Sequence, residues 1–292
     1  MVRRDFVLSS IILFILLSSG ITMHHSSYTV PLPNKNLLKT FLENQYVAEV
    51  GLLKAARFTY PENTTIYVAN DNVLAARALA VLGSPLALHV LYVLNHNFSS
   101  GWNCKVDVLL GKNIPDKFYA SYNEYVGKIN DYTIFYEKIN KTILINDWYN
   151  YADLLVYYAL NKLLMDSRFD AERAFLNLTK MWDGYGFKDN YSKEHGVYET
   201  YKCALYIYLY RALNVAGSKL VSNYKNIYDK CLKIITKAQD PVFGGIYTNY
   251  KVVNNKVIIL KGNGYDMNTE TTSIVVLAIY SNYPEIIGSR GC

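Results

Sequence analysis

The spacing of apolar residues along this chain predicts two kinds of helix. In the first kind, apolar positions recur every three or four residues and polar residues occupy the opposite face, which is typical of a helix with one side in solvent. These segments are 37–56, 168–182 and 220–238. In the second kind, apolar residues surround the whole circumference, so the helix must be enclosed by protein. These segments are 73–82, 151–165, 197–213 and 272–281.

The two kinds of helix alternate along the chain, with a short helix at 85–94 between the first and second enclosed ones. An inner ring of enclosed helices, wrapped by an outer ring of one-sided helices, satisfies this alternation with short connections. We therefore expect a fold dominated by α-helix. Its predicted form is an α/α toroid, an incomplete ring of about four helical hairpins.

Short runs of β-branched and aromatic residues interrupt the helical pattern in two places. The first place holds KVDVLL (105–110), YTIFY (132–136) and TILI (142–145), and the second holds 243–250 and 251–261 around the pair Asn254-Asn255. Such runs, bounded by turn residues, predict strands and a hairpin. We expect a single toroid domain over 37–292, with small β insertions near 104–146 and 243–261.

The N-terminal residues predict an exported protein. Two arginines precede an apolar run and a group of small residues, so 1–22 is a signal peptide or an N-terminal anchor, followed by a linker over 23–36. The apolar run is shorter than the roughly 20 residues of a spanning helix, which favours a cleaved signal. We expect a secreted or cell-surface protein that contacts the membrane only through this segment, if it is uncleaved.

Cysteine usage and charge refine this expectation. The four cysteines lie far apart with no C-x-x-C, which favours disulfides over metal binding, and Cys203 and Cys231 on successive helices are the preferred pair. N-x-S/T acceptor sites predict a glycoprotein and occur at Asn63, Asn97, Asn140, Asn177 and Asn190. The net charge of +6 is scattered, so no nucleic-acid partner is predicted.

Aromatic, glycine-rich turns lead into two of the enclosed helices. They are WDGYGF (182–187), before YETYKCAL (198–205), and FGGIY (243–247), before NTETTSIVV (268–276). With the alternating helices, they resemble the α/α toroids of the six-hairpin glycosidase, polysaccharide lyase and terpenoid cyclase type. The resemblance covers most of residues 37–283 and is one of architecture. It implies a carbohydrate-active protein and carries over no catalytic residue. The D-x-D-D motif of the cyclases is absent, which disfavours terpene chemistry.

Each enclosed helix begins with a polar segment that contains acids and often aromatic rings, at 70–72, 146–153, 195–202 and 266–272. N-caps and first-turn acids account for only part of these side chains. If the enclosed helices run parallel, their starts gather at one mouth of the ring. Acids and flat rings that converge in a concave place suit the binding of a sugar.

Glycoside hydrolysis needs one protonated and one ionised carboxyl beside the scissile bond. The predicted catalytic acids are Asp71, Asp153, Glu199 and Glu270. Glu199 and Glu270 form the predicted working pair, because neither is needed as an N-cap. The predicted substrate-binding residues are Trp148, Tyr151, His195, Tyr198, Tyr247 and Asn268. We therefore expect a glycosidase that acts on an oligo- or polysaccharide.

Two alternatives stay open. A polysaccharide lyase would abstract a proton with His195 or Tyr198, and a non-catalytic protein would use the toroid as a glycan-binding or structural scaffold at the cell surface. No cofactor or metal is predicted. The acids of 266–270 copy the start of a calcium loop, but Thr271 stands where the turn glycine belongs.

Overall fold

The computed structural model describes residues 30–58, 62–98, 104–262 and 264–282. The chain divides into two units, 1–30 and 31–292, and nearly all described residues belong to the second. The predicted signal or anchor at 1–22 and the first part of the predicted linker lie outside the described residues. Within the described part of the chain, no helix combines the length and the apolar composition needed to cross a bilayer.

The helices follow the predicted segments closely. They are α1 (Lys35–Gln45), α2 (Val73–Val81), α3 (Leu86–Asn97), α4 (Ala152–Leu164), α5 (Arg168–Lys180), α6 (Asn190–His195), α7 (Thr200–Val215), α8 (Lys225–Ala238) and α9 (Thr269–Tyr280). Short turns of other helix types are η1 (Glu62–Thr64), η2 (Val68–Asn72), η3 (Cys104–Leu110), η4 (Trp148–Asn150) and η5 (Leu220–Tyr224). The helix expected over 37–56 stops at Gln45. Beyond it the chain turns back through β1 (Tyr46–Val47) and β2 (Leu52–Leu53), with Gly51 at a positive φ of 76°.

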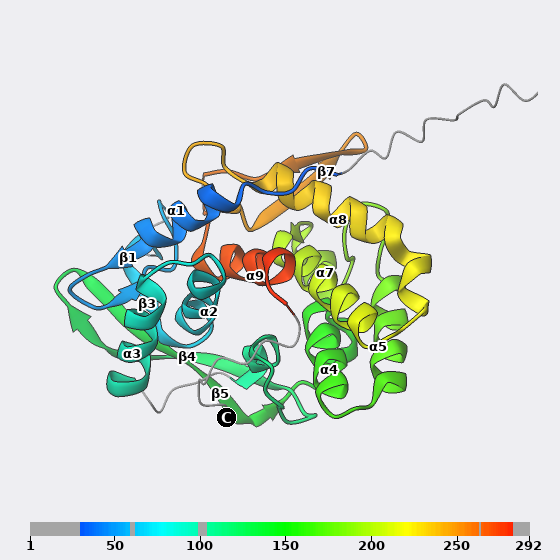
Figure 1. The fold of residues 1–292 in the computed structure, drawn as a ribbon, viewed down its shortest axis with the longest axis horizontal. Helices are drawn as coiled ribbons and strands as arrows, with labels where there is room; N and C mark the ends of the chain where they lie inside the picture. Colours follow the sequence, from blue (N-terminus) through cyan, green and yellow to red (C-terminus); the bar gives the residue numbers. More distant parts are fainter. Residues whose placement is uncertain (1–29, 59–61, 99–103, 263, 283–292) are drawn as a thin grey trace, which may run out of the picture. The chain divides into compact units, whose positions relative to one another are not determined.

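The expected division into enclosed and one-sided helices is confirmed. Figure 1 shows α2, α9, α7 and α4 next to one another, with α1, α8 and α5 on their outer sides, and α9 packs against both α2 and α7. Every residue of α9 from Thr271 to Ala278 is buried, whereas α8 buries only one stripe. Burial of apolar surface among these helices is the main stabilising contribution to the unit.

The prediction of an all-α toroid is nevertheless wrong, because the fold is mixed α/β. About 52% of the described residues are helical and 21% lie in strands or bridges, in three small sheets. Besides β1–β2, one sheet has the order β3 (Thr65–Tyr67), β5 (Tyr132–Leu144), β4 (Tyr119–Ile129), and another has the order β6 (Tyr198–Glu199), β7 (Asn249–Val253), β8 (Lys256–Ile259). The spacing of apolar residues in the helices does not predict the structure of the segments between them. These segments form strands that pair with each other and with short strands next to the helix starts.

The β insertions differ in detail from the predicted strands. YTIFY and TILI belong to one long strand, β5, which pairs with β4 in a hairpin. KVDVLL forms the 3₁₀ helix η3 instead of a strand, and its Val106 and Val108 to Leu110 are all buried. Periodicity cannot distinguish a buried strand from a buried helical turn in so short an apolar run. The predicted hairpin at Asn254-Asn255 is confirmed, and both residues have the positive φ that a type I′ turn requires.

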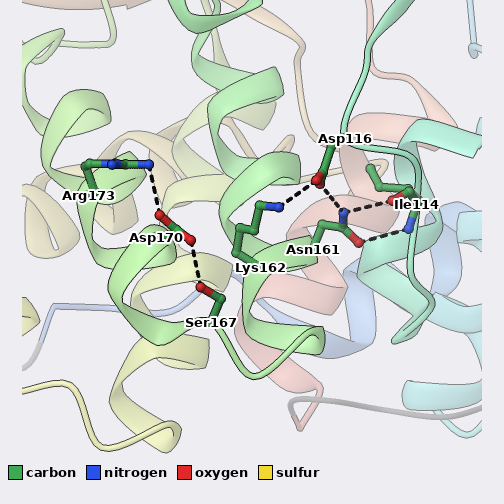
Figure 2. Close-up of polar contacts among 7 residues, drawn as sticks. All are labelled: Ile114, Asp116, Asn161, Lys162, Ser167, Asp170 and Arg173. Atoms are coloured by element: carbon green, nitrogen blue, oxygen red, sulfur yellow. Dashed lines mark hydrogen bonds and ion pairs between the residues drawn. The ribbon is translucent and has the colours of Figure 1, made fainter.

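A buried amide connects the β4–β5 hairpin to the helices. Asn161 of α4 accepts a hydrogen bond from the backbone N–H of Ile114 at 2.9 Å and donates to the backbone carbonyl of Ile114 at 2.8 Å. Its Nδ2 also donates to Asp116 at 3.0 Å, and Lys162 forms an ion pair with Asp116 at 2.6 Å (Figure 2). Asn161 is 1% exposed, so these bonds hold the segment that leads into β4 against α4.

The disulfide expected between Cys203 and Cys231 is not formed in this structure. Both residues are buried free thiols. Helices α7 and α8 do pack together as expected, and the pKa of the Cys231 thiol is raised by burial and by its hydrogen bond with Cys203. Among the predicted glycosylation sites, Asn97 and Asn177 are exposed, whereas the amide of Asn190 donates to Asp147 at 3.1 Å. Glycosylation stays a prediction.

Candidate active site

A polar cavity lies where the N-terminal ends of α2, α4, α7 and α9 meet strand β5. It has two adjoining parts, of about 340 and 320 Å³, which share Glu137, Thr248, Asn268 and Glu270 in their walls. The first part is also lined by Asp71 and the second by Asp153 and Glu199. A concave site of this size, with several convergent polar groups, is what a small ligand or one end of a polymer requires.

The four acids predicted from the sequence as catalytic are therefore brought together. Asp71 lies in η2, directly before α2, and Asp153 lies in the first turn of α4. Glu199 ends β6 directly before α7, and Glu270 is in the first turn of α9. The local sequence places each acid at the start of its own helix. The packing of the helices then brings the four starts together.

Neither Glu199 nor Glu270 serves as a helix cap. Asn268 caps α9, and its Oδ1 accepts from the backbone N–H of Thr271 at 2.7 Å. Glu199 occupies the N-cap position of α7, but its side chain makes no capping hydrogen bond. The backbone N–H of Thr200 at the start of α7 donates to the carbonyl of Thr248 at 2.7 Å. Capping therefore uses neither carboxyl, and both line the cavity.

A buried lysine controls the charge of Glu199. Lys202 Nζ lies 2.6 Å from Glu199 Oε2 and 2.6 Å from Asp189 Oδ2, and its side chain is only 3% exposed. Asp189 is held in turn by the backbone N–H groups of Ala152 and Ser192. Burial raises the pKa of Glu199, and the nearby Lys202 ammonium opposes that rise. The short ion pair with Lys202 favours the ionised form of Glu199.

Glu270 has the opposite environment. Burial, followed by the charges of Glu137 and Glu199, raises its pKa to about 8. The pKa of Asp71 is also raised well above its usual value by burial, and then by Glu270 and Glu137. The environment of Glu270 thus favours its protonated form, whereas the ion pair with Lys202 favours the ionised form of Glu199. Two carboxyls whose pKa values are pushed apart in one site are suited to general acid and base roles.

Three phenols contribute to the walls of the cavity. Tyr201 donates a hydrogen bond to Glu199 Oε2 at 3.3 Å and lines the same part of the cavity as Tyr157. Tyr67 lines the other part. Burial, followed by neighbouring carboxylates, raises the pKa values of Tyr157 and Tyr201 well above the usual value, so both keep their protons and can donate hydrogen bonds.

Most of the predicted substrate-binding residues lie elsewhere. Asn268 lines both parts of the cavity, whereas the other five are not among the described residues of its walls. Trp148 packs in an aromatic group on the side of α4, and Tyr151 directly precedes that helix. Helical periodicity does not tell which side of the turn before a helix faces a cavity, so it cannot place the aromatic residues of the helix starts.

The remaining three predicted residues are occupied by contacts within the protein. His195 is exposed and stacks on Tyr191. Tyr198 stacks on Tyr250 and donates a hydrogen bond to Asp183. The His195 contact lies within α6, whereas the contacts of Tyr198 connect β6 to β7 and to the turn at Asp183.

Tyr247 is 8% exposed and donates to Asp240 at 3.1 Å. Burial and this carboxylate raise the pKa of Tyr247 to about 12. The Tyr247 hydroxyl is therefore already hydrogen-bonded within the protein, next to the FGGIY turn.

Three charged residues of the cavity are absent from the predicted site: Asp266, from the polar segment before α9, and two residues from segments outside the helix starts. Glu137 comes from β5 and Lys105 from η3, and both lie in segments expected to form β insertions away from the helix starts. No local pattern distinguishes these two side chains from other surface charges. Only the packing of β5 and η3 against the helices places them in the cavity.

Comparison with known proteins adds no relationship. Family models, curated proteins and solved structures all give no match to this chain. Among the described residues, no group of three or more histidine, cysteine or acidic side chains has a geometry suited to a metal ion.

Proposed function

We propose that the protein is a carbohydrate-active hydrolase that cleaves glycosidic bonds with Glu270 and Glu199. One observation carries this proposal: two carboxyls in different environments line the same cavity. Glu199 lies in a 2.6 Å ion pair with Lys202, and burial raises the pKa of Glu270 to about 8. Glycoside hydrolysis requires one protonated and one ionised carboxyl. The cavity walls also supply phenol, amide and hydroxyl groups that can bond to sugar hydroxyls.

Each acid has a defined role in this proposal. Glu270 gives its proton to the glycosidic oxygen as the bond from that oxygen to the anomeric carbon breaks. The carboxylate of Glu199 stabilises the positive charge that develops on the sugar, and either takes a proton from the attacking water or bonds to the anomeric carbon first. Water supplies the new oxygen at the anomeric carbon, and one of its protons returns to Glu270 by the end of the cycle.

Lys202 and Tyr201 support the ionised acid in this proposal. Lys202 keeps the charge on Glu199, and the Tyr201 hydroxyl orients the same carboxylate oxygen. The lyase alternative has less support, because His195 and Tyr198 are both held in contacts outside the described cavity walls. An exported or cell-surface location remains part of the proposal, and the N-terminal sequence pattern supports it.

The test is a screen for product release from a panel of oligosaccharides, with the wild type and two variants. Glu199→Gln and Glu270→Gln preserve shape but remove the proton chemistry, and each should lower kcat by about 10²- to 10⁴-fold. Glu194→Gln is the matched control, because Glu194 is exposed on α6. Cleavage by both variants at the wild-type rate would contradict the assignment.

The main competing function is glycan binding without cleavage. It predicts that the wild type binds an oligosaccharide and releases no product from any member of the panel. Binding is therefore measured by calorimetry in parallel with product release. Unfolding temperatures close to that of the wild type show that a lost activity reflects chemistry and not a lost fold.

A further inference from the structure

The side chain of Asn70 is a buried acceptor that the fold does not use. It lines the same part of the cavity as Glu199 and Glu270, and the residue is 6% exposed. Its Oδ1 has no hydrogen-bond partner among the described residues. A buried polar atom without a partner costs free energy, so such atoms in a cavity wall indicate a place for a ligand's hydrogen-bond donor.

The backbone at Asn70 is also strained. Its φ of 52° and ψ of −82° are non-helical values inside η2, although the residue is not glycine. Non-glycine residues with such angles persist where the surrounding structure holds them, and they are common at binding sites. The strain places the Asn70 amide beside Asp71 at the cavity wall. The backbone strain is thus a second unfavourable feature of Asn70, besides its unpaired Oδ1.

Acidic residues outnumber lysines around this acceptor. The acidic residues that line the two parts of the cavity are Asp71, Glu137, Asp153, Glu199, Asp266 and Glu270. Lys105 is the basic residue among the described walls, and Lys202 behind them is already paired with Glu199 and Asp189. Burial favours the protonated forms of Glu270 and Asp71. The other lining acids are Glu137, Asp153, Glu199 and Asp266, and they still outnumber Lys105 and Lys202, so the cavity is rich in acceptors and has more carboxyls than ammonium groups. A uronic acid would be repelled by it, whereas a ligand with a positive charge and several donors would be attracted.

We propose that the cavity binds an amino sugar, with the protonated amine accepted by Asn70 Oδ1 and the surrounding carboxylates. This inference rests on the proposed function only in using the same cavity as the substrate site, and it narrows the substrate class to basic sugars. The amine needs no chemical step, because the ammonium acts as a hydrogen-bond donor and a counter-charge. Binding and cleavage can therefore be tested separately.

The test compares four monosaccharides at pH 6, where glucosamine carries a protonated amine. Glucosamine, glucose, N-acetylglucosamine and glucuronate share one ring shape and differ in charge and donors. Dissociation constants are measured on the wild-type protein by NMR titration. Glucosamine should bind at least about tenfold more tightly than glucose or N-acetylglucosamine, and glucuronate should bind most weakly. Equal binding of glucose and glucosamine, or no binding of glucosamine, would overturn the proposal.

A pair of variants tests the role of Asn70. Asn70→Gly removes the acceptor at a position where glycine tolerates the positive φ, and it should weaken glucosamine binding by about tenfold. The matched control is Asn130→Gly, because Asn130 has the same φ of 52° and is exposed in the turn between β4 and β5. Asn130→Gly should leave the binding of glucosamine unchanged. Unchanged binding in a folded Asn70→Gly variant overturns the assignment of Asn70, and if this variant does not fold, the monosaccharide comparison still decides.

Failure of this inference can be distinguished from failure of the proposed hydrolase. Tight glucosamine binding without cleavage of any oligosaccharide would leave the amino-sugar site in place and remove the hydrolase. Cleavage of a neutral oligosaccharide, together with equal binding of glucose and glucosamine, would support the hydrolase and remove the amino-sugar site.

Discussion

The ammonium of Lys202 lies 2.6 Å from the carboxylate of Glu199, inside the protein and one helical turn further along the chain. The same ammonium lies 2.6 Å from Asp189, whose side chain is fully buried. Burial by itself would lower the pKa of Lys202, but the carboxylates of Glu199, Asp153 and Asp189 raise it above its usual value. One buried positive charge thus favours the ionised form of a cavity acid and joins the start of α6 to α7.

Replacing Lys202 should strongly destabilise the protein. Lys202→Met leaves Glu199 and Asp189 as buried carboxylates without a counter-charge, which should cost about 3 to 5 kcal/mol. Lys225→Met is the control. Its ion pair with Asp229 at 2.7 Å has side chains 66% and 34% exposed, so its loss should cost less than about 1 kcal/mol. Urea unfolding at pH 7 measures both free energies. Equal costs for the two variants would show that Lys202 does not neutralise this site.

The proposed activity should depend on pH in a bell-shaped manner. Glu270 must be protonated, and its pKa is raised to about 8, so kcat/KM should fall as the pH rises above about 8. Glu199 must be ionised, and burial raises its pKa, so the acid limb should lie above the usual value of 4.5. A profile of kcat/KM from pH 4 to 10 on a neutral substrate measures both limbs. Activity that continues to rise above pH 9 would exclude Glu270 as the acid.

The stability of the protein should also depend on the ionisation of Glu270. Between the usual glutamate pKa of 4.5 and the folded value of about 8, the folded state holds a proton that the unfolded state has lost. The free energy of unfolding should therefore decrease as the pH rises through this window. Glu270→Gln removes this contribution and should be more stable than the wild type at pH 9 by about 1 to 3 kcal/mol.

Urea unfolding at pH 5 and pH 9 measures this effect. The exposed Glu194 on α6 again provides a control, because Glu194→Gln should change stability equally at the two pH values. A Glu270→Gln variant with the wild-type pH dependence would mean that Glu270 has an ordinary pKa in the folded protein.

Gly244, the first glycine of the FGGIY turn, should tolerate no side chain. Gly244 has a φ of +84°, and a Cβ placed there would lie 2.1 Å from the backbone oxygen of Leu37 on α1. Gly244→Ala should cost about 4 kcal/mol or more. Gly184→Ala is the matched control, because its φ is +103° and nothing lies within 4 Å of the added Cβ. This control should cost only the strain of a positive φ, about 1 to 2 kcal/mol. Thermal unfolding separates the two, and equal losses would mean that α1 can move away from the turn.

The amide of Asn161 should be needed to attach the β4–β5 hairpin. Asn161→Ala leaves the buried N–H and carbonyl of Ile114 without partners and should cost about 1 to 3 kcal/mol. Lys162→Ala removes the neighbouring ion pair to the half-exposed Asp116 and should cost less than about 1 kcal/mol. Hydrogen exchange of β4 and β5 should increase in Asn161→Ala and remain unchanged in Lys162→Ala. The opposite order would show that the ion pair, and not the amide, holds the hairpin.

The sequence by itself determined the helices and the acids at their starts. The apolar circumference of 73–82 and 272–281 predicts enclosed helices because periodicity reports directly on burial, and α2 and α9 are enclosed. The polar segments before α7 and α9 indicate Glu199 and Glu270 because caps and first turns are local structures. Local interactions act within a few residues, so they can be identified along the chain.

Only the tertiary structure decided the fold class and the composition of the cavity. β3 pairs with β5 across more than 60 residues of chain, and β6 pairs with β7 across about 50, so the sheets depend on contacts that no local pattern encodes. Glu137 and Lys105 enter the cavity through such long-range packing. The charge states of Glu199 and Glu270 likewise depend on which groups surround each carboxyl in three dimensions, because desolvation and Coulomb interactions act through space.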